Sequence, residues 1–304
     1  MTIALANATV DTDPEVEQVR RFNRAVTQRV GALSDHYLAR SRPLSACRVL
    51  WEIGVEGAEV RALRAQLGID SGQLSRLLRA LEADDLIQVI PSPADARIRV
   101  ATLTPAGMAE RRVLDGRSDE LARSILAPLD PAQRERLVTA MRSVERLITA
   151  SLVETRIVDP EHPDAKRCLR AYVAELNRRS DIPFDPRNGS TAEPHEVRGP
   201  AGAFLVAYLN AEAIGCGAVK HRRGGPSDIK RMWVAESARG LGIGRRLLRE
   251  LEELARESGA GVVQLETNAA LVEAITMYRS AGYAEVPAFN EEPFADHWFA
   301  KPLS

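Results

Sequence analysis

The fold of the second half of the chain is decided by the stretch Ile229-Lys230-Arg231-Met232-Trp233-Val234-Ala235-Glu236-Ser237-Ala238-Arg239-Gly240-Leu241-Gly242-Ile243-Gly244. Its first residues have strand character up to Val234, and a helix with apolar residues on one face begins near Ile243. The turn between them is rich in glycine, which lets successive backbone N–H groups point into one concavity. The N-terminus of the helix adds positive potential there, so the turn favours a bound pyrophosphate.

A glycine-rich turn also serves as a plain tight connection between a strand and a helix. This turn differs from two other phosphate-binding motifs. No acidic residue is evident near the end of a following parallel strand, as dinucleotide-binding folds have, and the Lys-Ser/Thr pair of a P-loop is absent. The role of the turn therefore has to be inferred from the strands and helices around it.

Strand and helix segments alternate from Glu154 onward. We expect a helix over 164–179, two strands that form a hairpin around 210–212, and a strand over 262–266 before the chain returns to the sheet after Ala284. This order predicts a mixed α/β domain.

The glycine-rich stretch resembles the GNAT superfamily of N-acetyltransferases, whose signature is Arg or Gln, two residues, Gly, one residue, then Gly or Ala. Arg239, Gly242 and Gly244 match that signature. A second match from Ala274 to Tyr283 follows the helix-and-strand element of the family. The resemblance covers about residues 154–302. It implies the acyl-CoA N-acyltransferase fold, acetyl-CoA as co-substrate and an amine as acetyl acceptor.

The resemblance also implies which residues hold acetyl-CoA. The backbone of Met232 and Val234 should hold the acetyl carbonyl and the pantetheine arm, and the amides from Arg239 to Arg245 should hold the pyrophosphate. Many relatives have an asparagine seven residues before the tyrosine, where this chain has Leu271. The predicted cofactor-binding residues are Met232, Val234, Arg239, Gly240, Leu241, Gly242, Gly244, Arg245 and Asn268.

Two residues are predicted to carry the catalytic step. The resemblance makes Tyr278 the acid that protonates the leaving thiolate of CoA, although its helical spacing fits a core tyrosine equally well. Because an amine attacks only when neutral, a base or a water path must remove its proton. Asp228 lies near the position where some relatives carry a glutamate base, and it also fits a turn or salt-bridge residue. Weaker candidates for the base are Glu266, Glu236 and His221.

The first half of the chain contains a DNA-reading pattern. Two short helices joined by Gly68-Ile69-Asp70 have the layout of a helix-turn-helix, and a strand, turn and strand follow over 86–103. Leucines 74, 77, 78 and 81 of the second helix face the core. The opposite face and the turn present side chains that suit DNA, although a solvated polar surface has the same composition. The predicted DNA-binding residues are Ser71, Gln73, Ser75, Arg76, Arg79 and Arg97.

These motifs resemble the MarR family of transcriptional regulators over about residues 14–150. They are Ser75-Arg76 in the recognition helix, Asp95-x-Arg97 in the wing and Leu103-Thr104-x-x-Gly107 after it. The resemblance implies a homodimer held by its terminal helices, which reads a pseudo-palindromic operator in double-stranded DNA. Arg97 would reach the minor groove at the tip of the wing, with Asp95 as its structural partner.

The terminal helices are visible in the sequence itself. Asp13-Pro14, Thr104-Pro105 and Asp130-Pro131 are typical helix starts, with an N-cap followed by proline. After the first of them, apolar residues recur with heptad spacing from Val16 to Tyr37. This seam predicts helix packing, either within the chain or between two chains.

The composition is that of an ordinary globular protein, with 304 residues of which 45% are hydrophobic and 27% charged. No segment approaches the ~20 apolar residues that span a bilayer, so we expect no membrane contact and a cytoplasmic location. The formal net charge of -1 leaves any DNA contact to a local basic patch. The three cysteines, Cys47, Cys168 and Cys216, are too widely spaced for a metal site or a disulfide framework.

The sequence thus predicts two domains, a mainly α, MarR-like winged helix-turn-helix over 1–152 and a mixed α/β GNAT domain over 153–304. We expect a bifunctional regulator and N-acetyltransferase whose acceptor is the amine of a small molecule. Two alternatives stay open: the second half only senses acyl-CoA or another metabolite, or the first half serves only dimerisation or docking. The acceptor should be set by the loops 181–200 and 287–298.

Overall fold

The computed structural model describes residues 13–34, 36–179, 192–222 and 224–303. Contacts within the chain divide it into two compact units, Met1–Arg136 and Leu137–Ser304. The division falls inside helix α6 (Pro131–Ser151), and the predicted boundary at residue 152 lies directly after this helix.

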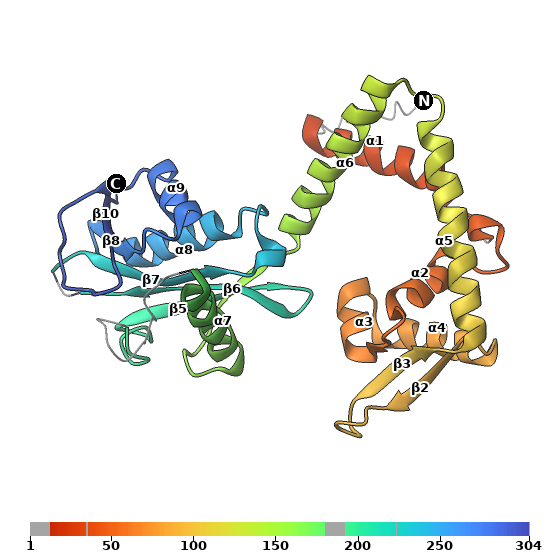
Figure 1. Cartoon of the computed structure of the whole chain (residues 1–304), viewed down its shortest axis with the longest axis horizontal. Coiled ribbons are helices and arrows are strands. Elements are labelled where there is room, and N and C mark those ends of the chain that lie inside the picture. Colours follow the sequence, from red (N-terminus) through yellow and green to blue (C-terminus); the bar gives the residue numbers. More distant parts are fainter. Residues whose placement is uncertain (1–12, 35, 180–191, 223, 304) are drawn as a thin grey trace, which may run out of the picture. The chain divides into compact units, whose positions relative to one another are not determined.

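The first unit consists of helices and a small antiparallel sheet with strand order β1-β3-β2 (Figure 1). Its core contains a leucine from each of three helices: Leu50 of α2, Leu63 of α3 and Leu74 of α4. The elements are α1 (Pro14–Val30), α2 (Leu44–Ile53), α3 (Val60–Leu67), α4 (Ser71–Ala83), α5 (Pro105–Leu126), β1 (Ala58–Glu59), β2 (Ile87–Pro91) and β3 (Arg99–Leu103).

The predicted starts of the three long helices are confirmed. The side chain of Asp13 accepts a hydrogen bond from the Glu15 amide at 2.9 Å, and Thr104 and Asp130 cap α5 and α6 in the same way. These caps satisfy amides that have no partner inside the helix.

The predicted apolar seam of α1 is wrong beyond Val30. Gly31 adopts a left-handed conformation with φ 69° and ends the helix, so Leu33 and Tyr37 do not continue its face. Glycine takes this conformation without strain, which makes it a common helix terminator. Within α1, Val16, Val19 and their apolar neighbours remain exposed.

A buried ion pair fastens α5 to the segment before α2. Glu110 accepts hydrogen bonds from Nε and Nη2 of Arg40 at 2.8 and 2.6 Å, and Arg42 lies 3.5 Å from the same carboxylate. The side chain of Glu110 is 9% exposed. The hydrogen bonds from Arg40 lower the pKa of Glu110 below its ordinary value of 4.5, and the charge of Arg42 adds to the effect.

We expect Glu110→Gln to lower the free energy of unfolding by about 2–3 kcal/mol near pH 7, because two charge-assisted hydrogen bonds are weakened in a buried place. A lowered pKa in the folded state stabilises the fold at pH values above the unfolded pKa, and this contribution is lost as the pH falls through the folded pKa. Denaturant unfolding at about pH 7 and about pH 3 should therefore show a smaller difference at the lower pH. An equal difference at both values would contradict this assignment. Asp119→Asn, which breaks an exposed pair with Arg123, is the control and should change stability by less than about 1 kcal/mol.

In the second unit the described residues form a seven-stranded sheet of order β4-β5-β6-β7-β8-β10-β9, in which β7 and β8 pair in parallel and the other neighbours pair antiparallel. The mixed α/β fold expected from the sequence is confirmed, with the predicted hairpin as β5 and β6. The strands are β4 (Glu154–Ile157), β5 (Gly202–Leu209), β6 (Glu212–Lys220), β7 (Ser227–Val234), β8 (Val262–Thr267), β9 (Ala284–Glu285) and β10 (His297–Pro302), and the helices are α7 (Pro163–Arg179), α8 (Ile243–Glu257) and α9 (Val272–Ser280).

Helices α7 and α8 pack on different faces of this sheet. Side chains alternate along β5, so that Leu205 joins the cluster that contains Leu247 of α8, whereas Phe204 joins the cluster that contains Cys168 of α7. Strand β5 is buried on both faces as a result.

Strands β7 and β8 are paired only at their beginnings, through Ser227 with Val263 and Asp228 with Gln264. Further along β7 a bulge places Arg231 and Met232 opposite Gly217 of β6. Arg231 has a φ of 60°, in the left-handed region. A Cβ on Gly217 would lie 2.7 Å from the sulfur of Met232, so a larger residue there would displace that side chain. Beyond the bulge the backbone of β7 has no strand neighbour on the β8 side among the described residues.

Candidate functional site

The loop between β7 and α8 has its amides available at the start of the helix. Gly240 and Gly242 adopt φ values of 81° and 78°, which only glycine takes without strain. Gly242 is the N-cap of α8, and no side chain caps this helix end. The first N–H groups of a helix have no acceptor within the helix, so they and the helix dipole form a site for an anion.

A cavity of about 460 Å³ lies beside this loop. Met232 and Val234 at the unpaired end of β7 line it, and Met277 of α9 adds apolar surface. The other predicted cofactor-binding residues that line the cavity are Arg239, Gly240, Gly242, Gly244 and Arg245. Leu241 is different, because it packs against the core cluster under α8. The cavity therefore joins an anion site to an apolar channel, as a pantetheine pyrophosphate requires.

Glu175 of α7 fixes the loop to the rest of the unit. Its carboxylate forms an ion pair with Arg239 and accepts a hydrogen bond from the indole of Trp233 at 3.0 Å. Nearby, Arg179 of α7 pairs with Glu273 of α9 at 2.7 Å, and both residues line the cavity. These contacts hold α7 and α9 on the two sides of the channel.

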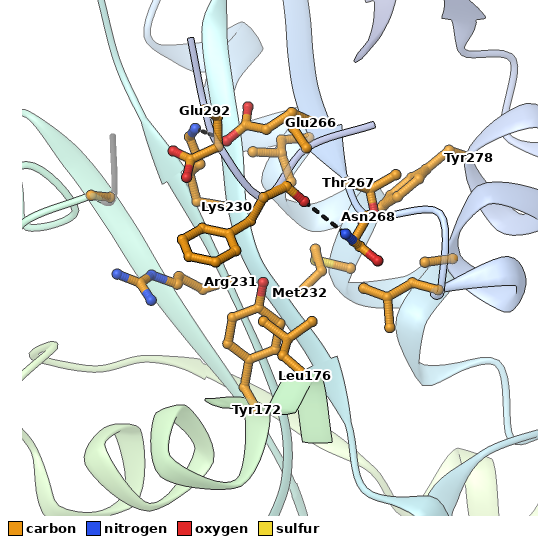
Figure 2. A pocket seen from close by; sticks show the side chains of 16 residues that line it. Tyr172, Leu176, Lys230, Arg231, Met232, Glu266, Thr267, Asn268, Tyr278 and Glu292 are labelled. Atoms are coloured by element: carbon orange, nitrogen blue, oxygen red, sulfur yellow. Dashed lines mark hydrogen bonds and ion pairs between the residues drawn. The ribbon is translucent and has the colours of Figure 1, made fainter. Parts of the chain in front are cut away.

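A second cavity of about 100 Å³ adjoins the first and lies where β7 and β8 separate (Figure 2). Tyr172, Leu176, Met232, Leu271, Ala274 and Tyr278 line both cavities. The second one also contains charged groups: the buried ion pair of Lys230 with Glu266, the buried Glu292 and the guanidinium-bearing Arg231. Figure 2 shows the carboxylates of Glu266 and Glu292 near the amino group of Lys230.

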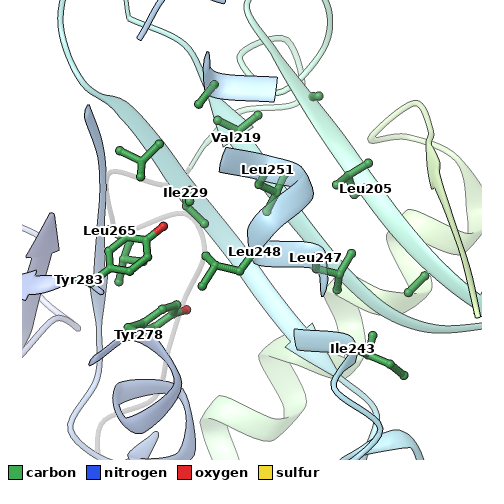
Figure 3. Packing of buried hydrophobic residues seen from close by; sticks show 14 of the residues in the cluster. Leu205, Val219, Ile229, Ile243, Leu247, Leu248, Leu251, Leu265, Tyr278 and Tyr283 are labelled. Carbon is green, nitrogen blue, oxygen red and sulfur yellow. The ribbon is translucent and has the colours of Figure 1, made fainter. Parts of the chain in front are cut away.

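Tyr278 lies at the junction of the two cavities, on α9. Its ring packs against that of Tyr283, with the centroids 5.8 Å apart (Figure 3). The ring of Phe299 lies on it as well, with a centroid distance of 6.1 Å. Burial raises the pKa of Tyr278 above its usual range, so its hydroxyl stays protonated at neutral pH. Tyr278 is thus a core tyrosine, as its helical spacing suggested, and it also lines both cavities.

Asp228 lies outside both cavities. Its carboxylate is buried and accepts hydrogen bonds from Nε of Arg222 and from the amide of Gln264, each at 2.7 Å. Of the weaker candidates for a base, only Glu266 lines a cavity; His221 contacts Ser227 and Glu236 is exposed. The structure therefore brings Glu266, and not Asp228, into a cavity that Tyr278 also lines.

Asn268 lines the second cavity at the end of β8. Its amide nitrogen donates to the carbonyl of Phe294 at 2.9 Å, and its amide oxygen accepts from the backbone of Ala270. The side chain thus fastens the C-terminal loop to the sheet, and it lies away from the glycine loop. The loop 181–200 is the other segment predicted to set the acceptor, and its residues 181–191 lie outside the described residues.

Helix α4 of the first unit presents the predicted DNA-binding face. Leu74, Leu78 and Leu81 are buried. Asp70 caps the helix by accepting from the Gln73 amide at 2.8 Å, as the helix-turn-helix pattern requires. The predicted DNA-binding residues of this helix are all exposed: Ser71, Gln73, Ser75, Arg76 and Arg79. A polar helix face is thus held on an apolar core, the arrangement of a recognition helix.

The β2–β3 hairpin forms the wing (Figure 1). Asp95 accepts a hydrogen bond from the backbone amide of Arg97 at 2.9 Å and so shapes the turn. Arg97 is exposed at the tip. Asp95 is its structural partner through the backbone, which leaves the guanidinium of Arg97 available to a phosphate or a groove.

The comparisons with known proteins agree with this geometry. Residues 170–283 match the model of the acetyltransferase (GNAT) family. An IAA acetyltransferase of Azospirillum brasilense is 34% identical over 119 residues, which cover 39% of this chain and 78% of that protein. The chain belongs to the GNAT acetyltransferase family. The N-alpha-acetyltransferase RimI of Mycobacterium tuberculosis is 36% identical over 132 residues, or 40% of this chain and 74% of that protein.

The first unit has its own match. Residues 42–98, which include α2, α3, α4 and the wing, match the model of the MarR family. Among solved structures, an acetyltransferase of the GNAT family from Staphylococcus aureus covers 50% of this chain and 100% of its own, with 19% identity and a TM-score of 0.42. The two family matches show a MarR-like domain fused to a GNAT acetyltransferase domain.

Several residues of the GNAT site were not found from the sequence. Tyr172, Glu175 and Glu292 are far from the glycine motif in the chain, and only the fold brings them to the cavities. Glu292 lies in the loop 287–298, which was expected to set the acceptor, and that expectation is the one sequence signal that pointed to it. Within the described residues, no helix is long and apolar enough to cross a membrane, and no cluster of His, Cys, Asp or Glu suits a metal ion.

Proposed function

We propose that the chain is a bifunctional DNA-binding regulator and acetyl-CoA-dependent N-acetyltransferase that acts on the amine of a small molecule. The observation that carries the enzymatic part is the junction of the two cavities. A channel that begins at an uncapped helix N-terminus meets a charged pocket at Met232 and Tyr278. A thioester in the channel and an amine in the pocket would meet at that junction.

In this proposal the amine nitrogen attacks the carbonyl carbon of the thioester. A C–N bond forms, the C–S bond breaks, and the amine loses a proton. Tyr278 gives its proton to the departing sulfur, for which its protonated state is required. The unpaired backbone of β7 at Met232 and Val234 orients the acetyl group and the pantetheine arm.

We assign the removal of the amine proton to the Glu266 side of the pocket, directly or through water. Glu266 lines the pocket and forms an ion pair with Lys230 there. Asp228 was the first candidate from the sequence, but Arg222 and Gln264 already occupy its carboxylate. Its role in the proposal is to hold the start of β7 against β8.

The test is a calorimetric titration with acetyl-CoA, followed by a screen of amines with detection of released thiol. Binding together with thiol release that depends on an amine supports the enzyme. Binding without release for any amine supports the alternative, in which the GNAT domain only senses acyl-CoA. An absence of binding would overturn both.

The regulatory part of the proposal rests on α4 and the wing. We propose that a homodimer places two copies of α4 in successive major grooves of a pseudo-palindromic operator, with Arg97 in the minor groove. The terminal helices would form the dimer. Apolar side chains on α1 are exposed within the single chain: Val16, Val19, Phe22 and Val26. Burying them against a second copy would remove this surface from water.

We expect Arg76→Ala to weaken binding to a selected operator about 10- to 100-fold, because an exposed arginine on this face contacts base edges or phosphates. The operator is first selected by the wild-type protein from random duplexes, and affinity is then measured by fluorescence anisotropy at several salt concentrations. Arg112→Ala removes the same charge from the exposed side of α5 and is the control. If both variants bind as the wild type does, α4 is not the reading helix.

A further inference from the structure

Arg239, the first residue of the glycine-loop signature, is held in place by several hydrogen bonds. Its backbone amide donates to the carbonyl of Glu236 at 3.2 Å, and its Nε donates to the carbonyl of Val234 at 3.3 Å. Its Nη2 donates to the carboxylate of Glu175. Because these three groups already have acceptors, a pyrophosphate could take them only by breaking those bonds. Arg239 therefore closes the turn after β7, and the anion site lies beyond it, at the N-terminus of α8.

Glu175 of α7 is the fixed end of this link. Its side chain is 11% exposed, whereas that of Arg239 is 38% exposed. The same carboxylate accepts a hydrogen bond from the indole of Trp233 at 3.0 Å, so it is bonded to the end of β7 as well as to the loop. Gly240 directly follows Arg239 and has a φ of 81°. The direction in which the glycine loop leaves the sheet is thus set where Glu175 holds Arg239.

The helical spacing of α7 explains why Glu175 reaches the loop. Four residues of this helix line the cavity of about 460 Å³: Tyr172, Glu175, Leu176 and Arg179. Their spacing of i, i+3, i+4 and i+7 places them on one face of the helix. One helix face therefore forms a wall of the cavity and also supports the loop.

A carboxylate that lines an anion-binding cavity also repels the anion, because like charges oppose binding. The charge of Glu175 is offset by Arg239 and by Arg179, whose Nη1 lies 3.7 Å from its carboxylate. Repulsion and support of the loop predict opposite results when this carboxylate is neutralised. Repulsion predicts tighter binding of the anion, and support of the loop predicts weaker binding.

We propose that Glu175 is a positioning residue for acetyl-CoA. By holding the guanidinium of Arg239, it sets the orientation of the loop whose amides receive the pyrophosphate. This inference rests on the proposed acetyltransferase function and adds a residue that its co-substrate site needs. It also changes the role expected for Arg239, which supports the loop through Glu175 and does not itself bind the phosphate.

Glu175→Gln tests this link by calorimetric titration with acetyl-CoA. The amide oxygen of glutamine can still accept a hydrogen bond from the indole of Trp233, but the charge-assisted bond to Arg239 is lost. We expect the Kd of acetyl-CoA to rise at least about 10-fold, because the loop amides are no longer held in place for the pyrophosphate. Glu253→Gln removes the same charge from the exposed side of α8 and should bind as the wild type does. Unchanged or tighter binding by Glu175→Gln would overturn the proposal.

A double-mutant cycle tests whether Glu175 acts through Arg239. Arg239→Gln breaks the link from its more exposed end, so it also provides the test if Glu175→Gln does not fold. It should weaken the binding of acetyl-CoA by a similar factor. The double variant should bind within about 3-fold of the weaker single variant, since either change already breaks the link. Losses that multiply in the double variant, or wild-type affinity in Arg239→Gln, would contradict this role.

Steady-state kinetics with an acceptor from the amine screen separates positioning from chemistry. The Glu175→Gln variant should raise KM for acetyl-CoA at least about 10-fold and leave kcat within about 3-fold of the wild-type value. A loss of kcat at unchanged KM would assign Glu175 to the chemical step and overturn the proposal. If the wild-type protein itself does not bind acetyl-CoA, the proposed function fails. If the wild type binds and Glu175→Gln binds equally well, only the inference about Glu175 fails.

Discussion

Replacement of Gly242 by aspartate should abolish acetyl-CoA binding, with a loss of affinity of at least about 100-fold. The carboxylate would stand at the N-cap of α8, where it competes with the pyrophosphate for the free amides and repels its charge. A Cβ at Gly242 meets no other atom within 4 Å, so the substitution does not collide with the fold. Calorimetric titration of the purified variant measures the effect.

Two control variants separate charge from backbone strain. Gly259 lies just after α8 with a φ of 88° and also has open space around it. Gly259→Asp should therefore cost similar stability and leave the affinity for acetyl-CoA unchanged. Gly242→Asn tolerates the same φ without a charge and should keep more affinity than Gly242→Asp. If Gly242→Asp binds acetyl-CoA as tightly as the wild type does, the pyrophosphate site lies elsewhere.

Replacement of Tyr278 by phenylalanine should lower kcat about 100-fold or more, because a positioned general acid contributes 10²–10⁴-fold to a rate. Binding of acetyl-CoA should change little, since the aromatic ring and its packing against Tyr283 and Phe299 remain. Because the pKa of Tyr278 is raised, its hydroxyl should stay protonated between about pH 7 and pH 9. Ionisation of this tyrosine should therefore not lower the rate in that range. Steady-state thiol release across that pH range measures both effects.

Tyr283 provides the matched control for this variant. It is buried in the same core, and its hydroxyl donates a hydrogen bond to Glu252 at 2.9 Å. Tyr283 lines neither of the two cavities described above. Tyr283→Phe should lower the free energy of unfolding by about 1 kcal/mol and leave kcat nearly unchanged. Equal losses of kcat in the two variants would indicate a structural role for Tyr278.

Local sequence determined much of the architecture. The N-caps that are followed by proline placed the starts of three helices, and the spacing of Leu74, Leu78 and Leu81 defined the buried face of α4. Glycine at 240 and 242 marked a turn that needs positive φ values. These features depend on neighbours within a few residues, and for that reason a sequence pattern reports them directly.

The catalytic site was only partly predictable. Tyr278 and the glycine loop were found because each belongs to a contiguous motif. Asp228 was placed on the correct strand, but the strand carries it to the paired end of β7, where it bonds to Gln264 of β8. Glu266, one of the weaker candidates for the base, lies on β8. It lines the second cavity because β7 and β8 separate there. Sequence spacing contains no information about that separation.

The sequence by itself determined the two kinds of domain, the order of their elements and the anion-binding turn. These features are indicated by hydrophobic periodicity, helix caps and glycines, which depend on residues that are close together in the sequence. Tertiary structure alone decided what lines the second cavity: Tyr172 from α7, Arg231 from the bulge of β7, Glu266 from β8 and Glu292 from the segment before β10. These residues come together because the pairing of β7 with β8 stops after Asp228 and because helices pack on the sheet. Both are contacts between residues far apart in the sequence.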